Sequence, residues 1–244
     1  AIMKHSTSVP LNNIKLLIID DDEEIREYIQ GVMKNYFLTT TASDGQEGLE
    51  MVEKFCPDII LCDVLMPNMT GYEFTRQLRK DKRTSHIPVI LLTSLSEEED
   101  KLKGYESGAD AYITKPFSIR LLLARIINIM EQRSELKEKF SKDDMNPTKL
   151  ILFSNDQDKK FLDRMNTIID HNLADQEFDV DAFAMAMGYK RTVFYQKVNA
   201  ITGKTPNEYL RDARLKKAAE LLLDDRLNVA EVAYQIGFTD PSYF

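Results

Sequence analysis

The chain has 244 residues, of which 43% are hydrophobic, and a formal net charge of −8. This length and apolar content predict two domains with hydrophobic cores, and they exclude a disordered or fibrous chain. The acidic balance argues against a protein that coats nucleic acid or acidic membranes through its overall charge, although a local basic patch remains compatible with it.

Short apolar runs alternate with amphipathic stretches over residues 13–117. The runs LLIID, TTTA, DIILCD, PVILLTS and DAYITKP predict five strands, which are rich in β-branched and other apolar residues. Helices are expected at residues 23–35, 45–55, 71–80, 97–107 and 119–131. This alternation predicts an α/β doubly wound, five-stranded parallel sheet with helices on both faces.

The strand pattern ends near residue 119, and a helical remainder follows. The helix that begins near Ser118 is expected to continue into the charged stretch EQRSELKEKFSKDD, which we interpret as a solvated linker because its apolar seam is too short for a coiled coil. KLILF is the candidate strand of this half. We predict one domain over residues 13–131, a helical and charged linker over 132–155, and an all-α domain over 156–244.

Cysteine content and the chain start bear on the location of the protein. Two cysteines are present, and Cys62 lies inside an apolar run, which indicates a buried thiol in a reducing compartment; the cytoplasm is therefore expected. No apolar run is long enough to cross a bilayer, so no membrane contact is expected of this segment. Ala1 and Ile2 precede Met3, and a tag scar followed by a fragment of a longer polypeptide would explain this start, although a free-standing protein with an unusual tag stays open.

Polar side chains stand where the predicted strands end. They are Asp20, Asp21, Asp22, Asp63, Thr93, Ser94 and Lys115. Taken singly, each has an ordinary interpretation, such as a helix cap for an aspartate or a surface position for the lysine. Together they form a carboxylate-rich edge of the sheet that needs a cation, and Mg²⁺ suits such oxygen donors. Asp63 would then be a usable nucleophile, with Lys115 placed to neutralise phosphate charge.

The motifs DDD, DVLMPNMTG, LLTS and TKPF, in this order and spacing, resemble the receiver domain of bacterial two-component response regulators. The resemblance covers about residues 13–131 and implies a flavodoxin-like fold. It also implies that Asp63 is the phosphoacceptor in a phosphorelay from a histidine kinase. The implied Mg²⁺ ligands are Asp63, Asp21, Asp20 through water, and the backbone carbonyl of Leu65.

The same resemblance assigns the residues that respond to phosphorylation. Lys115 would contact the phosphoryl oxygens, Thr93 would move toward them, and Tyr112 would turn inward as the switch residue. A homodimer through the fourth and fifth helices would follow. Leu65 and Leu95 depart from the best-studied receivers because neither offers a polar side chain to orient a hydrolytic water, so we expect a long-lived phosphoryl group with at most slow self-dephosphorylation.

The last part of the chain contains two similar helix-turn-helix patterns. FDVDAFAMAMGYKRTVFYQKVNAITG predicts two helices around a turn at Gly188, and NVAEVAYQIGFTDPSYF repeats the pattern around Gly237. With the helix PNEYLRDARLKKAAELLL between them, they resemble an AraC-type DNA-binding domain over about residues 161–244. The resemblance implies further helices after Phe244, so we expect this copy of the domain to be incomplete at its C-terminal end.

A local excess of positive charge accompanies this domain. Residues 188–217 hold eight basic and two acidic residues, which favours phosphate contacts. The basic residues are Lys190, Arg191, Lys197, Lys204, Arg211, Arg214, Lys216 and Lys217. Phe194 and Val198 have the spacing of core residues. The residues expected to face the major groove of an operator are Lys190, Arg191, Thr192, Tyr195 and Gln196.

These patterns together predict a transcriptional regulator whose dimerisation and DNA binding depend on phosphorylation, and which is not an enzyme. Two alternatives stay open: an aspartyl-phosphate enzyme acting as a phosphatase or phosphotransferase, and a docking module that works without phosphorylation. The sequence also leaves open whether the kinase is a separate protein or is fused N-terminally in a hybrid sensor and regulator.

Overall fold

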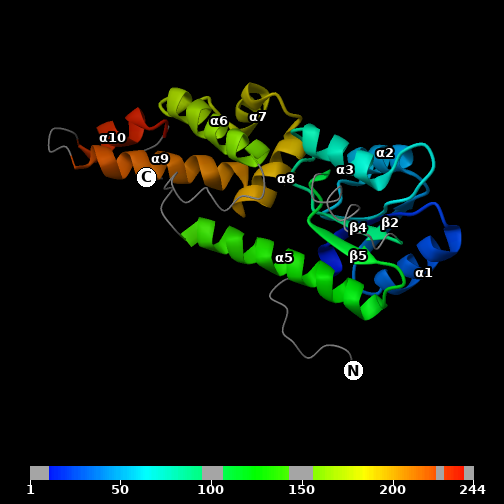
Figure 1. The fold of residues 1–244 in the computed structure, drawn as a ribbon. Helices are drawn as coiled ribbons and strands as arrows, with labels where there is room; N and C mark the ends of the chain where they lie inside the picture. The colour runs from blue at the N-terminus through cyan, green and yellow to red at the C-terminus, as the bar shows by residue number, and fades with distance from the viewer. Residues whose placement is uncertain (1–10, 95–106, 143–155, 224–227, 239–244) are drawn as a thin grey trace. The chain divides into compact units, whose positions relative to one another are not determined.

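The computed structural model describes residues 11–94, 107–142, 156–223 and 228–238. The chain divides into two compact units, Ala1–Leu136 and Lys137–Phe244 (Figure 1). Most of the helix predicted at residues 97–107, the candidate strand KLILF and Leu95 lie outside the described residues. None of the helices in the described ranges has the length and apolarity that a membrane span requires.

The first unit is built on a fully parallel sheet of five strands with the order β2-β1-β3-β4-β5, which confirms the predicted fold class. The strands are β1 (Lys15–Ile19), β2 (Leu38–Ala42), β3 (Ile59–Asp63), β4 (Val89–Thr93) and β5 (Ala111–Thr114). Every residue of β3 and β4 is buried, as the continuous apolar runs predicted. The order of the strands reverses between β1 and β3, where a doubly wound sheet places its ligand site.

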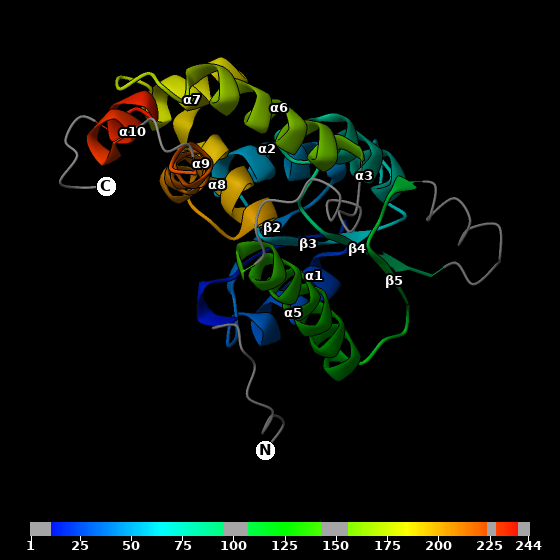
Figure 2. The same cartoon turned by 90° about the vertical axis from the view of Figure 1, so that its left-hand side faces the viewer.

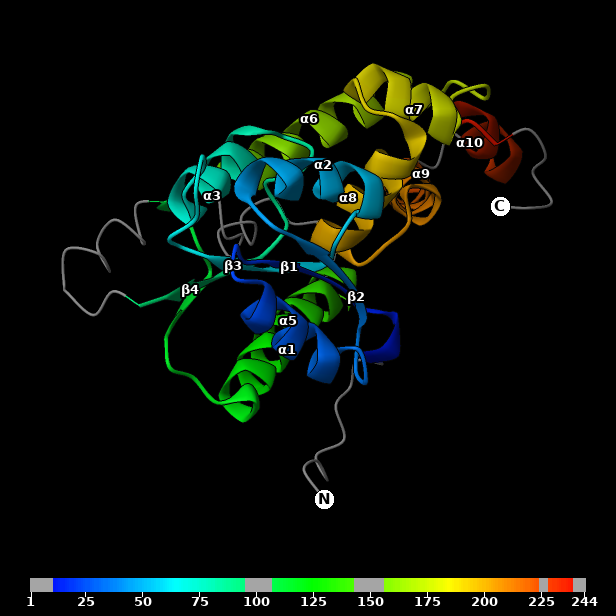
Figure 3. The same ribbon diagram turned by 90° about the vertical axis from the view of Figure 1, so that its right-hand side faces the viewer.

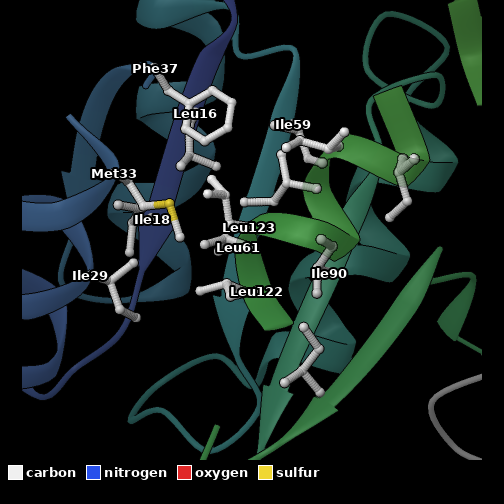
Figure 4. Packing of buried hydrophobic residues seen from close by; sticks show 14 of the residues in the cluster. Leu16, Ile18, Ile29, Met33, Phe37, Ile59, Leu61, Ile90, Leu122 and Leu123 are labelled. Carbon is white, nitrogen blue, oxygen red and sulfur yellow. The ribbon is translucent and has the colours of Figure 1, made fainter. Parts of the chain in front are cut away.

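Helices cover both faces of this sheet. They are α1 (Glu23–Met33), α2 (Gly45–Phe55), α3 (Gly71–Lys80) and α5 (Ile119–Lys142). Figures 2 and 3 show α1 and α5 on one face and α2 and α3 on the other. Alternate strand residues fill the two resulting cores, one between the sheet and α1 and α5, the other between the sheet and α2 and α3. In the first core, Leu122 and Leu123 of α5 lie beside Leu61 of β3 (Figure 4).

Side-chain caps fix where the helices of this unit begin. The Asp22 carboxylate accepts hydrogen bonds from the backbone N–H groups of Glu24 and Ile25, so Asp22 is the cap of α1. Thr70 and Glu73 form a reciprocal capping box at the start of α3. Because these caps depend only on neighbouring residues, the sequence alone sets where α1 and α3 begin.

In its described residues, the second unit consists of helices joined by turns and contains no strand. Its helices are α6 (Asp156–Asn172), α7 (Val180–Met187), α8 (Arg191–Thr202), α9 (Pro206–Leu221) and α10 (Val229–Gln235). Gly188 ends α7 at φ 79° and Gly237 follows α10 at φ 80°, so both predicted turns use a glycine in the left-handed region. Phe161, Phe183 and Phe194 are buried in the core that joins α6, α7 and α8.

Candidate functional site

Three charged side chains from distant parts of the chain meet at the carboxyl edge of the sheet. Asp20 follows β1, Asp63 ends β3 and Lys115 follows β5. Lys115 Nζ lies 2.9 Å from Asp20 Oδ2 and 2.5 Å from Asp63 Oδ1. The side chains of Asp20, Asp63 and Lys115 are 1%, 7% and 17% exposed, respectively. One ammonium group therefore bridges two buried carboxylates at the reversal point of the sheet.

Backbone groups hold both carboxylates in place. Asp20 Oδ1 accepts a hydrogen bond from the Asp22 N–H at 3.0 Å, and Asp63 Oδ2 accepts one from the Leu65 N–H at 2.9 Å. The Lys115 N–H donates to the carbonyl oxygen of Thr93 at 2.6 Å, which anchors the lysine backbone beside the end of β4. In each carboxyl group, one oxygen accepts a backbone hydrogen bond, and this bond orients the other oxygen toward Lys115.

Burial and the ion pairs shift the pKa values of Asp63 and Lys115 in opposite directions. Burial raises the pKa of Asp63, and the negative charge of Asp20 adds to the rise, while the hydrogen bond and charge of Lys115 oppose it. Burial alone lowers the pKa of Lys115, but its hydrogen bonds to Asp63 and Asp20 and their charges outweigh burial and raise it. Lys115 therefore stays cationic between the two acidic side chains.

The other predicted residues of this edge occupy different environments. Thr93 is 5% exposed at the end of β4, and Tyr112 is partly buried with its hydroxyl 3.4 Å from Ser107 Oγ. Asp21 is exposed, and its side chain makes no hydrogen bond or ion pair with a described residue. Leu65 is 52% exposed. The structure thus brings Asp20, Asp63, Lys115 and Thr93 to one edge.

The donors at this edge are compatible with a hard divalent cation. Within the described residues, no three acidic, histidine or cysteine side chains converge as a metal-binding group, so the metal ligands stay a prediction. The chemistry of the donor set fits Mg²⁺, because the predicted ligands are carboxylate and carbonyl oxygens and the carboxylates outnumber the one lysine. Cys62 offers no competing thiolate ligand, since burial raises its pKa well above the ordinary value.

The predicted DNA-facing residues lie on α8 and at its start. Lys190, Arg191 and Thr192 are exposed, whereas Tyr195 and Gln196 are partly buried. Arg191 forms an ion pair with Asp181 at 2.6 Å. The predicted core positions of this helix, Phe194 and Val198, are fully buried. One face of α8 therefore packs into the helical unit and leaves a polar face at the surface.

The basic surface is smaller than its sequence count predicts. Lys197 is completely buried and forms an ion pair with Asp158, so its assignment to the phosphate-binding surface is wrong. Arg214 is partly buried and donates hydrogen bonds to the carbonyl oxygens of Asp175 and Phe178. Lys204 is paired with Asp212 at 2.8 Å. These contacts hold the helices together and divert part of the positive charge from the surface.

Two protein-family models match this chain, one in each of its parts. A family model for the response regulator receiver domain matches residues 16–127, and a model for a helix-turn-helix domain matches residues 183–244. The chain is a response regulator receiver domain followed by a helix-turn-helix domain. The resemblance predicted from the sequence is therefore confirmed.

Two curated relatives match different shares of the chain. Histidine kinase P4 of Formosa agariphila is 39% identical over 230 residues, which cover 94% of this chain and 17% of that protein. The phosphate regulon transcriptional regulatory protein PhoB of Escherichia coli is 38% identical over 123 residues, which cover 50% of this chain and 54% of that protein. The chain thus spans about half, or much less, of the length of these curated relatives.

Solved structures match the receiver part of the chain. The receiver domain of Francisella response regulator 1452 is 39% identical, with 50% of this chain and 99% of that chain covered and a TM-score of 0.46. The chemotaxis response regulator CheY4 of Vibrio cholerae is 32% identical, with 48% and 99% covered and a TM-score of 0.46.

Gly71 ends the DVLMPNMTG motif, but the sequence did not predict its close approach to Asp63. A Cβ atom added at Gly71 would lie 2.2 Å from the carbonyl oxygen of Asp63, so only glycine lets the start of α3 approach the end of β3 so closely. Its N–H donates to the carbonyl oxygen of Val64 at 3.0 Å. The available signal was a glycine directly after the capping threonine, where most residue types would be accepted by a helix alone.

Proposed function

We propose that this protein is a transcriptional regulator in which a histidine kinase phosphorylates Asp63 and the helix-turn-helix domain binds operator DNA. The observation that carries the proposal is the bridge from Lys115 to Asp20 and Asp63 at the reversal point of the sheet. A nucleophilic carboxylate beside a fixed cation suits the transfer of a phosphoryl group. The names of two relatives, a histidine kinase and a transcriptional regulatory protein, support the donor and the output.

In the proposed reaction, one Asp63 carboxylate oxygen attacks the phosphorus of a kinase phosphohistidine. A P–O bond forms, the P–N bond breaks, and its electron pair returns to the imidazole nitrogen. Lys115 loses one carboxylate partner as the charge of Asp63 is consumed, and its ammonium group turns to the phosphoryl oxygens. The Leu65 N–H keeps the carboxyl group of Asp63 oriented during the transfer.

Asp20, Asp21, Asp63 and the carbonyl oxygen of Leu65 would hold Mg²⁺, which supplies positive charge to the phosphoryl oxygens. The side chain of Thr93, at the end of β4, would move toward the phosphoryl group, and Tyr112 would turn inward. These movements would shift an existing equilibrium toward a homodimer that places two helix-turn-helix domains on repeated half-sites.

We propose the predicted boundaries for this architecture: a receiver domain over residues 13–131, a linker over 132–155 and a DNA-binding domain over 156–244. At the DNA, Lys190, Arg191, Thr192, Tyr195 and Gln196 would read base edges and phosphates from α8 and its start. The kinase partner is either a separate protein or part of the same polypeptide. The match to histidine kinase P4 over 94% of this chain supports the second arrangement.

The first experiment tests the phosphoacceptor. The purified chain is incubated with a small phosphoryl donor such as phosphoramidate, with and without Mg²⁺, and phosphoryl incorporation is measured by intact-mass spectrometry. Wild type and Asp58→Asn should gain one phosphoryl group only when Mg²⁺ is present, and Asp63→Asn should gain none. Asp58 is the matched control because it is an exposed aspartate at the opposite end of β3.

The second experiment tests the switch. Affinity for duplexes selected from a random library is measured with and without beryllofluoride, a phosphoryl mimic for Asp63. Tighter binding with the mimic is expected, and equal affinity in both states would refute phosphorylation control. A lack of Mg²⁺-dependent labelling of Asp63 in the first experiment would instead favour a docking module that works without phosphorylation.

Receiver and helix-turn-helix domains in one chain are typical of a regulator without enzymatic activity. An aspartyl-phosphate phosphatase would need an acid two residues after the nucleophile to protonate the leaving group, and Leu65 stands there. Turnover of small phosphate esters by the purified chain would support this alternative. We expect no turnover above the background of Asp63→Asn.

A further inference from the structure

A buried ion pair lies beneath the proposed DNA-reading helix. Lys197, in the middle of α8, has no exposed surface, and its Nζ lies 3.1 Å from Asp158 Oδ1. The same ammonium group lies 5.0 Å from the centre of the Phe161 ring. Asp158 is 4% exposed in the first turn of α6, where the partial positive charge at a helix N-terminus favours a carboxylate.

Stability alone does not account for a charged pair at this position. The neighbouring buried residues on the same face of α8 are Phe194, Val198 and Ile201, so an apolar side chain would continue the core. Removing a lysine and a carboxylate from water is costly, and replacing such a pair with apolar residues is often neutral or stabilising. The pair differs from an apolar contact in one respect: its attraction has a direction and a fixed length.

We propose that Lys197 and Asp158 fix the rotation of α8 about its own axis, and thereby determine which side chains meet the base edges of DNA. Lys197 is therefore a positioning residue, since it has no surface with which to touch DNA itself. The inference rests on the proposed DNA-binding function of this domain.

A small rotation of α8 about its axis is enough to displace the side chains that would contact DNA. With side chains, a helix has a radius of about 5–6 Å, so a rotation of about 20° moves the tip of a side chain by about 2 Å. A hydrogen bond to a base edge does not survive a displacement of that size. Tyr195 and Gln196 directly precede Lys197 in the same helix, so a rotation of α8 that follows the loss of the ion pair would displace both side chains.

The test replaces the ion pair by an apolar pair, Asp158→Leu with Lys197→Met, in the full chain. Duplexes are selected from a random library with the wild type, and the ratio of affinities for selected and random duplexes is then measured for both proteins. The apolar pair should keep or raise the melting temperature, and its affinity ratio should fall by about tenfold or more, the size of losing one good base contact. An unchanged ratio would overturn the proposal.

The matched control is Glu50→Leu with Lys54→Met, which removes an exposed i,i+4 ion pair on α2. It should leave the affinity ratio unchanged, and a fall as large as that of the Asp158 and Lys197 variant would attribute the effect to charge loss in general and overturn the proposal. A single Lys197→Met variant should melt at a lower temperature, because Asp158 would be left buried without its cation.

A second variant keeps the proposal testable if the apolar pair does not fold. Lys197→Arg retains the charge and the pairing with Asp158, but its longer side chain must fit a site with no exposed surface, so α8 has to shift or rotate. It should select a different set of duplexes, and selection of the wild-type set with the wild-type ratio would overturn the proposal. Absence of sequence preference in the wild type itself would instead refute the proposed DNA-binding function.

Discussion

Replacing Lys115 by methionine removes the cation from two buried carboxylates while keeping most of the side-chain volume. Asp20 and Asp63, whose side chains are 1% and 7% exposed, would then face each other without a partner from a side chain. We expect the free energy of unfolding of the receiver domain to fall by about 3 kcal/mol. This is the lower end of the range for breaking a buried ion pair, chosen because Lys115 itself is 17% exposed.

The mechanism predicts how the loss can be recovered. Adding Asp63→Asn to Lys115→Met leaves a single carboxylate, Asp20, in the cluster, so most of the lost stability should return. Adding Mg²⁺ to the Lys115→Met variant should also restore stability, because a ligand that binds the native state stabilises it in proportion to the logarithm of its concentration. Lys54→Met on the exposed surface of α2 is the matched control and should change the free energy of unfolding by less than about 0.5 kcal/mol.

Native-state hydrogen exchange of the β1 and β3 amides measures these changes. It reports on the receiver domain alone, whereas a melting curve of the whole chain combines two units. A loss below about 0.5 kcal/mol for Lys115→Met, or a double variant no more stable than the single one, would refute the reasoning that Lys115 compensates both carboxylates.

Three further predictions concern the receiver domain. Gly71→Ala should destabilise the receiver domain by about 1–3 kcal/mol in a urea titration, because the added Cβ would lie 2.2 Å from the carbonyl oxygen of Asp63 and α3 would have to move; no change would show that α3 relaxes freely. Replacing Leu65 and Leu95 with Asn and Glu should speed loss of the phosphoryl group from Asp63 by about tenfold or more, followed by intact mass over time, and an unchanged half-life would count against the long-lived phosphoryl group. Hydrogen bonds from the N-cap residue Thr70 hold the pKa of Glu73 below its ordinary value of 4.5, so the contribution of Glu73 to stability is present above pH 4.5 and disappears as the pH falls through the lowered pKa. Glu73→Gln should therefore flatten the pH dependence of the urea midpoint over that window. An identical pH profile for the variant and the wild type would contradict the assignment.

Local patterns were sufficient for most of the fold. The helices predicted at residues 45–55 and 71–80 have the bounds observed for α2 and α3, because their caps and apolar spacing lie within a few residues of each helix. The helix predicted at 23–35 ends at Met33, two residues earlier, where α1 gives way to a turn. Helix ends depend on backbone hydrogen bonds that propensity does not specify.

The carboxyl edge was predictable because of topology. Parallel strands end at the same edge of a sheet, so Asp20, Asp63, Thr93 and Lys115 were expected together from the strand pattern alone. The strand pattern did not predict which carboxylates Lys115 contacts. It also did not predict that Asp21 is exposed. Side-chain contacts of this kind are set by distances in space between residues that are far apart in the chain.

The sequence by itself determined the element order, the parallel sheet, the helix-turn-helix pattern and the set of residues at the strand ends, because these follow from local periodicity and from the chirality of strand connections. Only the tertiary structure decided which charges are buried. The sequence pattern assigned Lys197 to a basic surface, but in the structure it is buried and paired with Asp158 of α6, 39 residues earlier in the chain. Burial is a property of the packed molecule, and so a charge can be assigned to the surface or to the interior only when its neighbours in space are known.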